Sequence, residues 1–413
     1  MQDDIKILLD YFLNKKEGRS ILIRIALIIV ALVILALVDY FYVSKIADKN
    51  NFLTYIDFSK GFFLEGNDPY ETNTFNRQQE INGRESFSFS SPVYLLFIFL
   101  PFSYIQDITL ASSAWIFINQ IIFANTIFLI IKILDWEIAP IKILFFILFS
   151  GFSYYSLINF LNLDIVIIQL FFFVLCLKAL LEMRDIEAGI FGGILSIAPG
   201  NLIVPFIILI ALILQKKRLT IFFWLIITVA FLSLGAIIFD TVWPLKMIRN
   251  LLGGFLNNFD ASAFNLPNIL EGGFINLFQL IPLILMLWLV LEWGITEKKT
   301  KQQILWIINI SICFNILIFP SRANLSSVLL CLVNIYIAHL WFDHKKKGYK
   351  FVIPLMVLIV IVMPLIADIE IIASGQAGDL EKIDLINVIF SVLLLYWIRW
   401  WVMAGSFTSE LDL

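Results

Sequence analysis

Residues 109–134 read TLASSAWIFINQIIFANTIFLIIKIL, and Lys132 is the only charged side chain among them. A helix needs about 20 apolar residues to cross the roughly 30 Å hydrocarbon core of a bilayer. Backbone groups in hydrocarbon have to bond within their own segment, which favours a helix over an isolated strand. This stretch therefore predicts a membrane-spanning helix.

Runs of the same kind recur at residues 20–43, 165–181, 219–239 and 274–291. Of the 413 residues, 61% are hydrophobic and 15% are charged, whereas soluble globular chains have about 45–50% and about 25%. We expect an all-α, polytopic integral membrane protein with roughly 11 to 13 transmembrane or re-entrant helices. Residues 1–413 would form a single transmembrane domain, with no soluble domain.

Basic residues predict the topology, because lysine and arginine in short loops mark the cytoplasmic side. Clusters within residues 15–19, 216–218, 298–301 and 345–350 place the N-terminus in the cytoplasm. The apolar run 20–43 is too long for a cleavable signal, and no small-residue cleavage site follows it, so we expect a retained signal-anchor in the cell membrane. Two long loops, about 44–91 and 240–273, are then external. Segments 92–105, with a break at Pro101, and 188–214, with a break at Pro199-Gly200-Asn201, are half-helices or kinked spans; we favour half-helices.

The sequence offers little support for disulfide, metal, cofactor or nucleic-acid sites. Cys176, Cys313 and Cys331 lie inside hydrophobic runs and are expected to be free thiols. The only histidines are His339 and His344, and no His/Cys cluster has zinc spacing. We expect no metal, no cofactor and no nucleic-acid partner.

The first long loop contains the strongest catalytic candidate, Asp57, in the stretch YIDFSKG at residues 55–61. We expect a short helix lying in the membrane interface, because five residues fall near one side of it: Phe52, Tyr55, Ile56, Ser59 and Phe63. Asp57 would lie at the border of that side, where partial desolvation suits a general base. The alternative is that Asp57 pairs with Lys60, three residues on.

The stretch GNDPY at residues 66–70 is first of all a turn. Asp68 is therefore expected to be structural rather than catalytic. The following stretch, residues 87–101, enters the membrane through Pro92, either as an ordinary helix start or as a half-helix whose N-terminus faces an anionic group.

Each of the other polar candidates has a structural and a ligand-binding interpretation. Asn162 and Asp164 either cap a turn between two spans or line a sugar site. Arg322, in a very short external turn, either binds a phosphate or lies at the interface without a ligand. The same alternatives hold for Lys246 and Arg249 in the second long loop.

Together these features resemble one family, the polytopic GT-C glycosyltransferases, and within it the bacterial mannosyltransferases related to phosphatidylinositol mannoside mannosyltransferases. The matching stretches are Asp57-Phe58, GNDPY at 66–70, Ser90-Ser91-Pro92, Leu100-Pro101, residues 188–205 ahead of the basic turn 216–218, and the external loop 258–273. The likeness covers about residues 24–323 in order, through short and degenerate motifs.

The resemblance implies transfer of a hexose, such as mannose, from a polyprenyl-phosphate donor to a lipid or glycan acceptor on the external face, with inversion. Asp57 would be the general base. Substrate contacts are expected at Lys60, Asp68, Tyr70, Asn162, Asp164, Lys246, Arg249 and Arg322. Polyprenyl phosphate is itself the leaving group, so no nucleotide-binding domain is needed, and membrane lipids surround the site.

Two departures from the family pattern bear on the donor phosphate. The stretch 161–164 lacks the Gly-Gln that often precedes its asparagine, and Pro199-Gly200-Asn201 stands where a lysine is common. Arg322 could compensate. The rival interpretations are a transporter or flippase for a lipid-linked sugar, which broken helices favour, and a non-catalytic assembly subunit.

The topology can be tested by single-cysteine labelling in a cysteine-free background. Positions 57, 68, 249 and 322 should react with a membrane-impermeant reagent in intact cells, and positions 217, 299 and 346 should react only after permeabilisation. Labelling of position 299 from outside would overturn the orientation.

Overall fold

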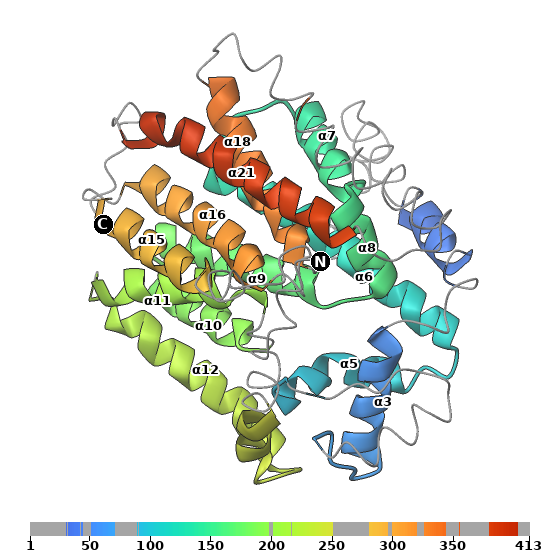
Figure 1. Cartoon of the computed structure of the whole chain (residues 1–413). Helices are drawn as coiled ribbons and strands as arrows, with labels where there is room; N and C mark the ends of the chain where they lie inside the picture. Colours follow the sequence, from blue (N-terminus) through green and yellow to red (C-terminus); the bar gives the residue numbers. More distant parts are fainter. Residues whose placement is uncertain are drawn as a thin grey trace, which may run out of the picture.

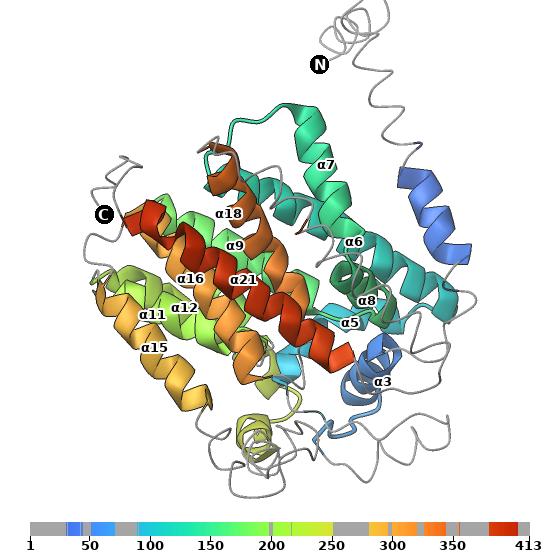
Figure 2. The ribbon, with the colours of Figure 1, turned by 45° about the horizontal axis from the view of Figure 1, so that its top comes forward.

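The computed structural model describes residues 32–41, 51–70, 91–197, 201–215, 217–250, 281–295, 300–319, 326–343 and 380–403, with a few single positions beside them. Every regular element in these ranges is helical. Figures 1 and 2 show α16, α18 and α21 side by side, with α3 and α5 together at another edge of the molecule. The all-α prediction is confirmed for the described part.

The helices follow the apolar runs. After a short apolar helix at Leu32–Phe41 come α3 Asn51–Leu64, η2 Val93–Leu95, α5 Leu96–Ser103, α6 Ile108–Ile133, α7 Pro140–Gly151, α8 Tyr154–Asn162, α9 Val166–Leu181, α10 Asp185–Leu195, α11 Ile203–Gln215 and α12 Leu219–Ile237. The second half contains α15 Ile281–Ile295, α16 Lys301–Ile318, η7 Ser327–Leu329, α18 Leu330–Asp343 and α21 Leu380–Met403.

Within the described part of the chain, three helices, α6, α12 and α16, are long and apolar enough to cross a membrane. The bent pair α7 and α8, whose axes meet at 62°, makes a fourth if the two are one span. At 26 residues, α6 is about 39 Å long. The expected total of 11 to 13 segments includes stretches outside the described residues, among them 351–354 and 356–366.

Side-chain caps fix where two of these spans begin. The Asp107 carboxylate accepts hydrogen bonds from the backbone N–H groups of Thr109 and Leu110 at the start of α6. Thr300 and Gln303 form a reciprocal capping box at the start of α16. Both devices satisfy N–H groups that the first turn of a helix leaves without partners.

The helical run 188–214 is interrupted, as expected. Helix α10 ends at Leu195 and α11 begins at Ile203, although residues 198–200 lie outside the described part. Asn315 of α16 supplies partners for the freed backbone: its amide donates to the Asn201 carbonyl at 2.8 Å and accepts from the Val204 N–H at 3.1 Å. A break in apolar surroundings is stable only when its backbone groups are satisfied in this way.

The interrupted pair returns to the end at which it began. Arg218, directly after α11, forms an ion pair with Asp185 at the start of α10 and donates to the Leu180 carbonyl at 2.8 Å. Neither α10 nor α11, at 11 and 13 residues, reaches the roughly 20 residues of a full span. The two helices therefore have the geometry expected of half-helices.

Helix α12 then runs parallel to α10, with two glycines at the contact. A Cβ atom at Gly189 would lie 2.6 Å from the Ile221 carbonyl oxygen, and one at Gly193 would lie 2.6 Å from Cβ of Thr228. Only glycine permits this approach, which is typical of helix packing inside membranes. The other face of α12 is exposed and apolar.

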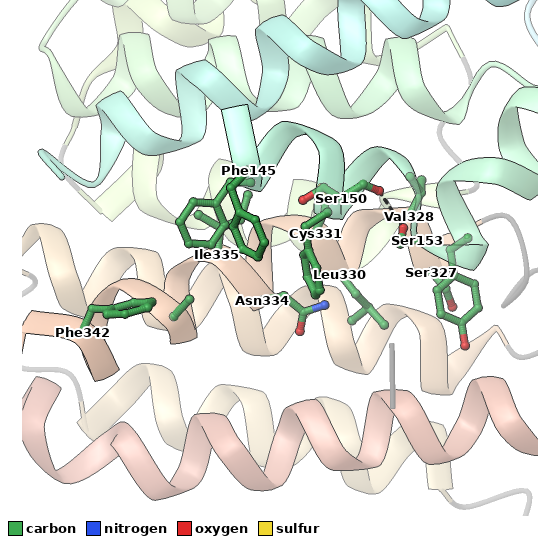
Figure 3. Close-up of a pocket in the computed structure, with 14 residues that line it drawn as sticks. Phe145, Ser150, Ser153, Ser327, Val328, Leu330, Cys331, Asn334, Ile335 and Phe342 are labelled. Atoms are coloured by element: carbon green, nitrogen blue, oxygen red, sulfur yellow. Dashed lines mark hydrogen bonds between the residues drawn. The ribbon is translucent and has the colours of Figure 1, made fainter. Parts of the chain in front are cut away.

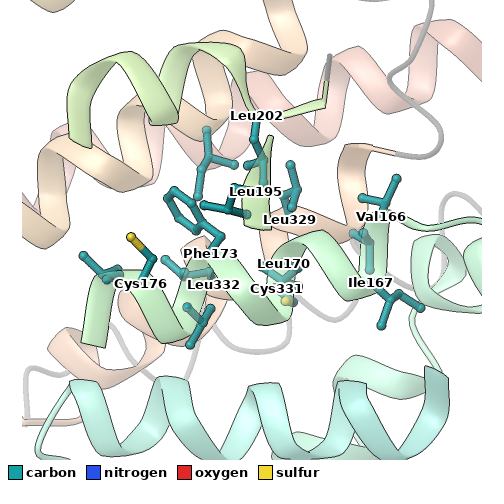
Figure 4. Close-up of a cluster of buried hydrophobic side chains, with 14 of the residues drawn as sticks. Val166, Ile167, Leu170, Phe173, Cys176, Leu195, Leu202, Leu329, Cys331 and Leu332 are labelled. Atoms are coloured by element: carbon teal, nitrogen blue, oxygen red, sulfur yellow. The ribbon is translucent and has the colours of Figure 1, made fainter. Parts of the chain in front are cut away.

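The main core lies around α9. Leu170, Phe173 and Cys176 of α9 are buried together with Leu195 of α10 and Leu329 of η7, as Figure 4 shows. All three cysteines are buried and free, as predicted.

A separate contact holds three helices of the second half together. Glu292 of α15 accepts hydrogen bonds from Arg399 of α21, at 2.8 and 3.1 Å, and from the Tyr396 hydroxyl at 3.1 Å. Arg399 also lies over the ring of Trp306 in α16. Pairing with an arginine in this way satisfies a carboxylate that is almost fully buried.

Segment 92–105 is short, as expected, but the predicted break at Pro101 is wrong. Helix α5 runs through Pro101 and ends at Ser103. A proline this close to the end of a helix removes one backbone hydrogen bond, and packing of Phe99 against Tyr55 and Phe52 of α3 holds the helix.

The glycine contact gives a matched pair of substitutions. Gly193→Ala should destabilise the protein by about 1–3 kcal/mol, because the added methyl group overlaps Thr228. Gly192→Ala is the control: its Cβ would lie 3.4 Å from the flexible end of Leu225, and alanine favours a helix. Thermal unfolding in detergent measures both. Equal melting temperatures for the two variants would contradict the close parallel packing.

Candidate functional site

The helix expected around Asp57 is present as α3, and its apolar side packs on α5. Phe52, Phe58 and Ser59 are buried, and the Ser59 hydroxyl donates to the Leu96 carbonyl at 3.1 Å. Tyr55 stacks on Phe99 with ring centroids 4.8 Å apart. The side predicted to lie against the membrane interface is therefore a packing surface against protein.

Asp57 is half-buried on another side of α3, and Lys60 is exposed. Leu53 and Gly61, one turn before and one turn after Asp57, are both buried. Asp57 is therefore flanked by two buried positions on its own side of α3 and by the exposed Lys60 one turn further on.

The two long loops meet at an ion pair. Lys246, in a helical stretch at residues 243–250, donates to Asp68 of the first loop and, at 2.9 Å, to Asp240 of the second. The side chains of Asp68 and Asp240 are mostly buried, at 14% and 15% exposed. Partial burial of Lys246 disfavours its charge, but the two carboxylates outweigh this effect, and the pKa of Lys246 is raised above its ordinary value.

Asp68 and Tyr70 hold the turn together. The Asp68 carboxylate accepts from the Tyr70 N–H at 2.9 Å, as in an Asx turn, and the Tyr70 hydroxyl donates to the Ser91 carbonyl at 2.8 Å. Burial, together with the negative charge of Asp68, raises the pKa of Tyr70. The Asn250 amide closes the turn from the second loop by donating to the Tyr70 carbonyl at 3.4 Å. These hydrogen bonds give both Asp68 and Tyr70 a structural part in the turn.

Tyr94 and Trp243 lie in the same region as the Lys246 ion pair and the 66–70 turn. Their rings meet edge to face, with centroids 5.7 Å apart. The Tyr94 hydroxyl lies 2.7 Å from the Ser196 hydroxyl at the end of α10. Trp243 is buried, and its indole N–H has no hydrogen-bond partner among the described residues. The helix break and the two loops thus meet in one polar region.

Asn162 is the last residue of α8, and Asp164 lies in the turn to α9. Asp164 is buried, and its carboxylate accepts from the Ile165 N–H, while Asn162 is exposed. Leu163 between them is left-handed, with φ of 56°, and its carbonyl accepts from the Trp115 indole at 3.0 Å. The contact of Asp164 with the Ile165 N–H is of the kind that the turn-and-cap interpretation describes for that residue.

Of the remaining candidates, Arg249 lies within the described residues and Arg322 does not. Arg249 is exposed on the same helical stretch as Lys246. Arg322 and the whole loop 258–273 lie outside the described residues. Sequence reasoning did not single out Asp240, Trp243, Asn250 or Tyr94. Asp240 directly follows the apolar run 219–239, and this position could have indicated a candidate site residue.

No family model, curated protein or solved structure matches this chain. Among the described residues, no group of three or more His, Cys, Asp or Glu side chains is placed to hold a metal ion.

Lys246→Met removes the cation shared by Asp68 and Asp240. A raised pKa means that the stabilisation by the charged lysine is complete below its ordinary pKa of 10.5 and is lost as the pH rises through the raised value. We therefore expect Lys246→Met to melt at a lower temperature than wild type at pH 7, with the difference disappearing in strongly alkaline buffer.

Lys60→Met is the matched control, because Lys60 is an exposed lysine on α3. It should melt as wild type does at both pH values. A Lys246→Met protein as stable as wild type at pH 7 would show that the ion pair does not join the two loops.

Proposed function

We propose that this protein is a membrane glycosyltransferase of the GT-C type. It transfers a hexose, such as mannose, from a polyprenyl-phosphate donor to a lipid or glycan acceptor on the external face of a cell membrane, with inversion. The observation that carries the proposal is the joining of the two long loops through Lys246, Asp68 and Asp240, next to the helix that contains Asp57.

Asp57 is the proposed general base. Its carboxylate takes the proton from the acceptor hydroxyl while the acceptor oxygen forms a bond to the anomeric carbon of the sugar. The bond from that carbon to the phosphate oxygen breaks, and polyprenyl phosphate leaves with the electron pair. Attack opposite to the leaving group inverts the anomeric centre. The half-buried position of Asp57 supports this role.

Arg249 is the proposed phosphate contact among the described residues. It is exposed, and its guanidinium can bind two phosphate oxygens at once. Lys246 is already paired with two carboxylates, so it is better suited to holding the loops than to binding the donor. Arg322 remains a candidate for the same phosphate. The leaving group is activated as a phosphate ester, and we propose no cofactor.

A transporter for a lipid-linked sugar is the second candidate, favoured by the helix break. Gln169, Asn201 and Asn315 form a chain of hydrogen bonds at this break, with the Asn201 amide donating to Gln169 at 2.9 Å. Broken helices with uncharged polar groups are typical of substrate sites in transporters. A transporter would move the lipid-linked sugar across the bilayer without cleaving it.

The test is sugar transfer by purified protein in lipid from a defined polyprenyl-phosphate hexose. Asp57→Asn should reduce turnover by about 10²- to 10⁴-fold, because asparagine keeps the size of the side chain but cannot accept the proton. Its melting temperature should stay near that of wild type.

Asp68→Asn is the matched control, because asparagine also supports the turn and Lys246 keeps its pair with Asp240. It should retain far more activity than Asp57→Asn. Near-normal turnover by Asp57→Asn beside an inactive Asp68→Asn would show that Asp57 is not the base. Movement of intact donor across the bilayer without transfer would favour the transporter.

A further inference from the structure

A cavity lies away from the candidate site, where α7, α8 and α18 meet. Helices α7 and α8 meet at a bend of 62°, and a space of about 60 Å³ lies between this bend, η7 and α18. One water molecule needs roughly 10–15 Å³ on the same measure, so the space is larger than a packing defect. Fourteen residues line it (Figure 3).

The two ends of the cavity differ in chemistry. Ser150, Ser153 and Ser327 gather at one end, and Phe145 and Phe342 lie at the other, as Figure 3 shows. Phe145 and Phe342 are also exposed at the molecular surface, at 54% and 36%. The aromatic end therefore opens toward the apolar exterior of the helices, and the serine end is closed.

Ser327 indicates what the closed end can bind. The residue is 1% exposed, and its hydroxyl has no hydrogen-bond partner among the described residues. The Ser153 hydroxyl, in contrast, already donates to the Ser150 carbonyl at 2.7 Å. A buried hydroxyl without a partner is costly, so a polar group that enters this end of the cavity would gain a hydrogen bond from Ser327. The Asn334 amide, also in the lining, adds both a donor and an acceptor.

The absence of charged residues among the described lining indicates which class of ligand fits the cavity. None of the fourteen described lining residues is acidic, basic or a histidine. A phosphate or carboxylate in such a cavity would lose its hydration without gaining a counter-charge. A ligand hydroxyl or ester carbonyl could instead hydrogen-bond to Ser327 and Asn334. The apolar chain of the same ligand would then extend to the surface along Phe145 and Phe342.

We propose that this cavity binds one uncharged single-chain amphiphile, of the 1-acylglycerol class, from the surrounding membrane. The polar end bonds to Ser327 and Asn334, and the acyl chain runs along Phe145 and Phe342 to the surface. This site is separate from the proposed transfer reaction and does not depend on it. Its chemistry excludes the anionic polyprenyl-phosphate donor.

The experiment uses full-length protein in phosphatidylcholine nanodiscs and a photoactivatable 1-acylglycerol, with the matching fatty acid as an anionic probe. The 1-acylglycerol should label peptides of α7 and α18 in preference to the fatty acid. Ala338→Trp, which fills the cavity, should abolish this labelling. Ser327→Ala should weaken apparent binding by about fivefold, the effect of one lost hydrogen bond.

Ser311→Ala is the matched control, because Ser311 is a buried serine of α16 outside the cavity. It should label as wild type does. If Ala338→Trp fails to fold, Ser327→Ala still decides the question. Three outcomes would each overturn the proposal. The fatty acid could label as strongly as the 1-acylglycerol or more strongly, or Ser327→Ala could bind as wild type does. Wild type could also show no labelling, as when part of this chain fills the cavity.

Discussion

The amide of Asn315 is the interaction on which much of the arrangement depends. By bonding to the Asn201 carbonyl and the Val204 N–H, it makes a helix break possible in apolar surroundings. The break allows α11 to return to the Asp185 end, where Arg218 starts α12. Helix α12 can then run parallel to α10 and carry the chain to the end of the molecule at which α10 stops.

That path brings residues far apart in the sequence into one region. The chain leaves α12 at Asp240, beside Asp68, and Lys246 pairs with both carboxylates. Trp243 reaches Tyr94, which contacts Ser196 at the end of α10. The polar region is therefore made by the same turn of the chain that breaks the helix. It joins the loop that contains the proposed base, Asp57, to the loop that contains the proposed phosphate contact, Arg249.

The sequence predicted features that depend on local pattern. The long apolar runs correspond to α6, α9 and α12, the GNDPY turn is held by Asp68, and the interruption before Ile203 is present. Features that depend on tertiary contact were missed. The packing of α3 on α5 needs the rings of Phe99 and Phe102, and Pro101 is tolerated because that packing holds the helix. The bend at residues 151–154 and the pairing of Asp240 with Lys246 likewise require partners distant in the sequence or in space.

The central claim is that the protein transfers a hexose from a polyprenyl-phosphate donor. Mass spectrometry of membrane lipids and glycans, from cells with wild-type protein, with Asp57→Asn and with none, tests it most directly. The account predicts that the last two accumulate an intact polyprenyl-phosphate hexose and lack one hexose on a particular lipid or glycan. Identical lipid and glycan profiles in all three, or full restoration of that hexose by Asp57→Asn, would contradict it.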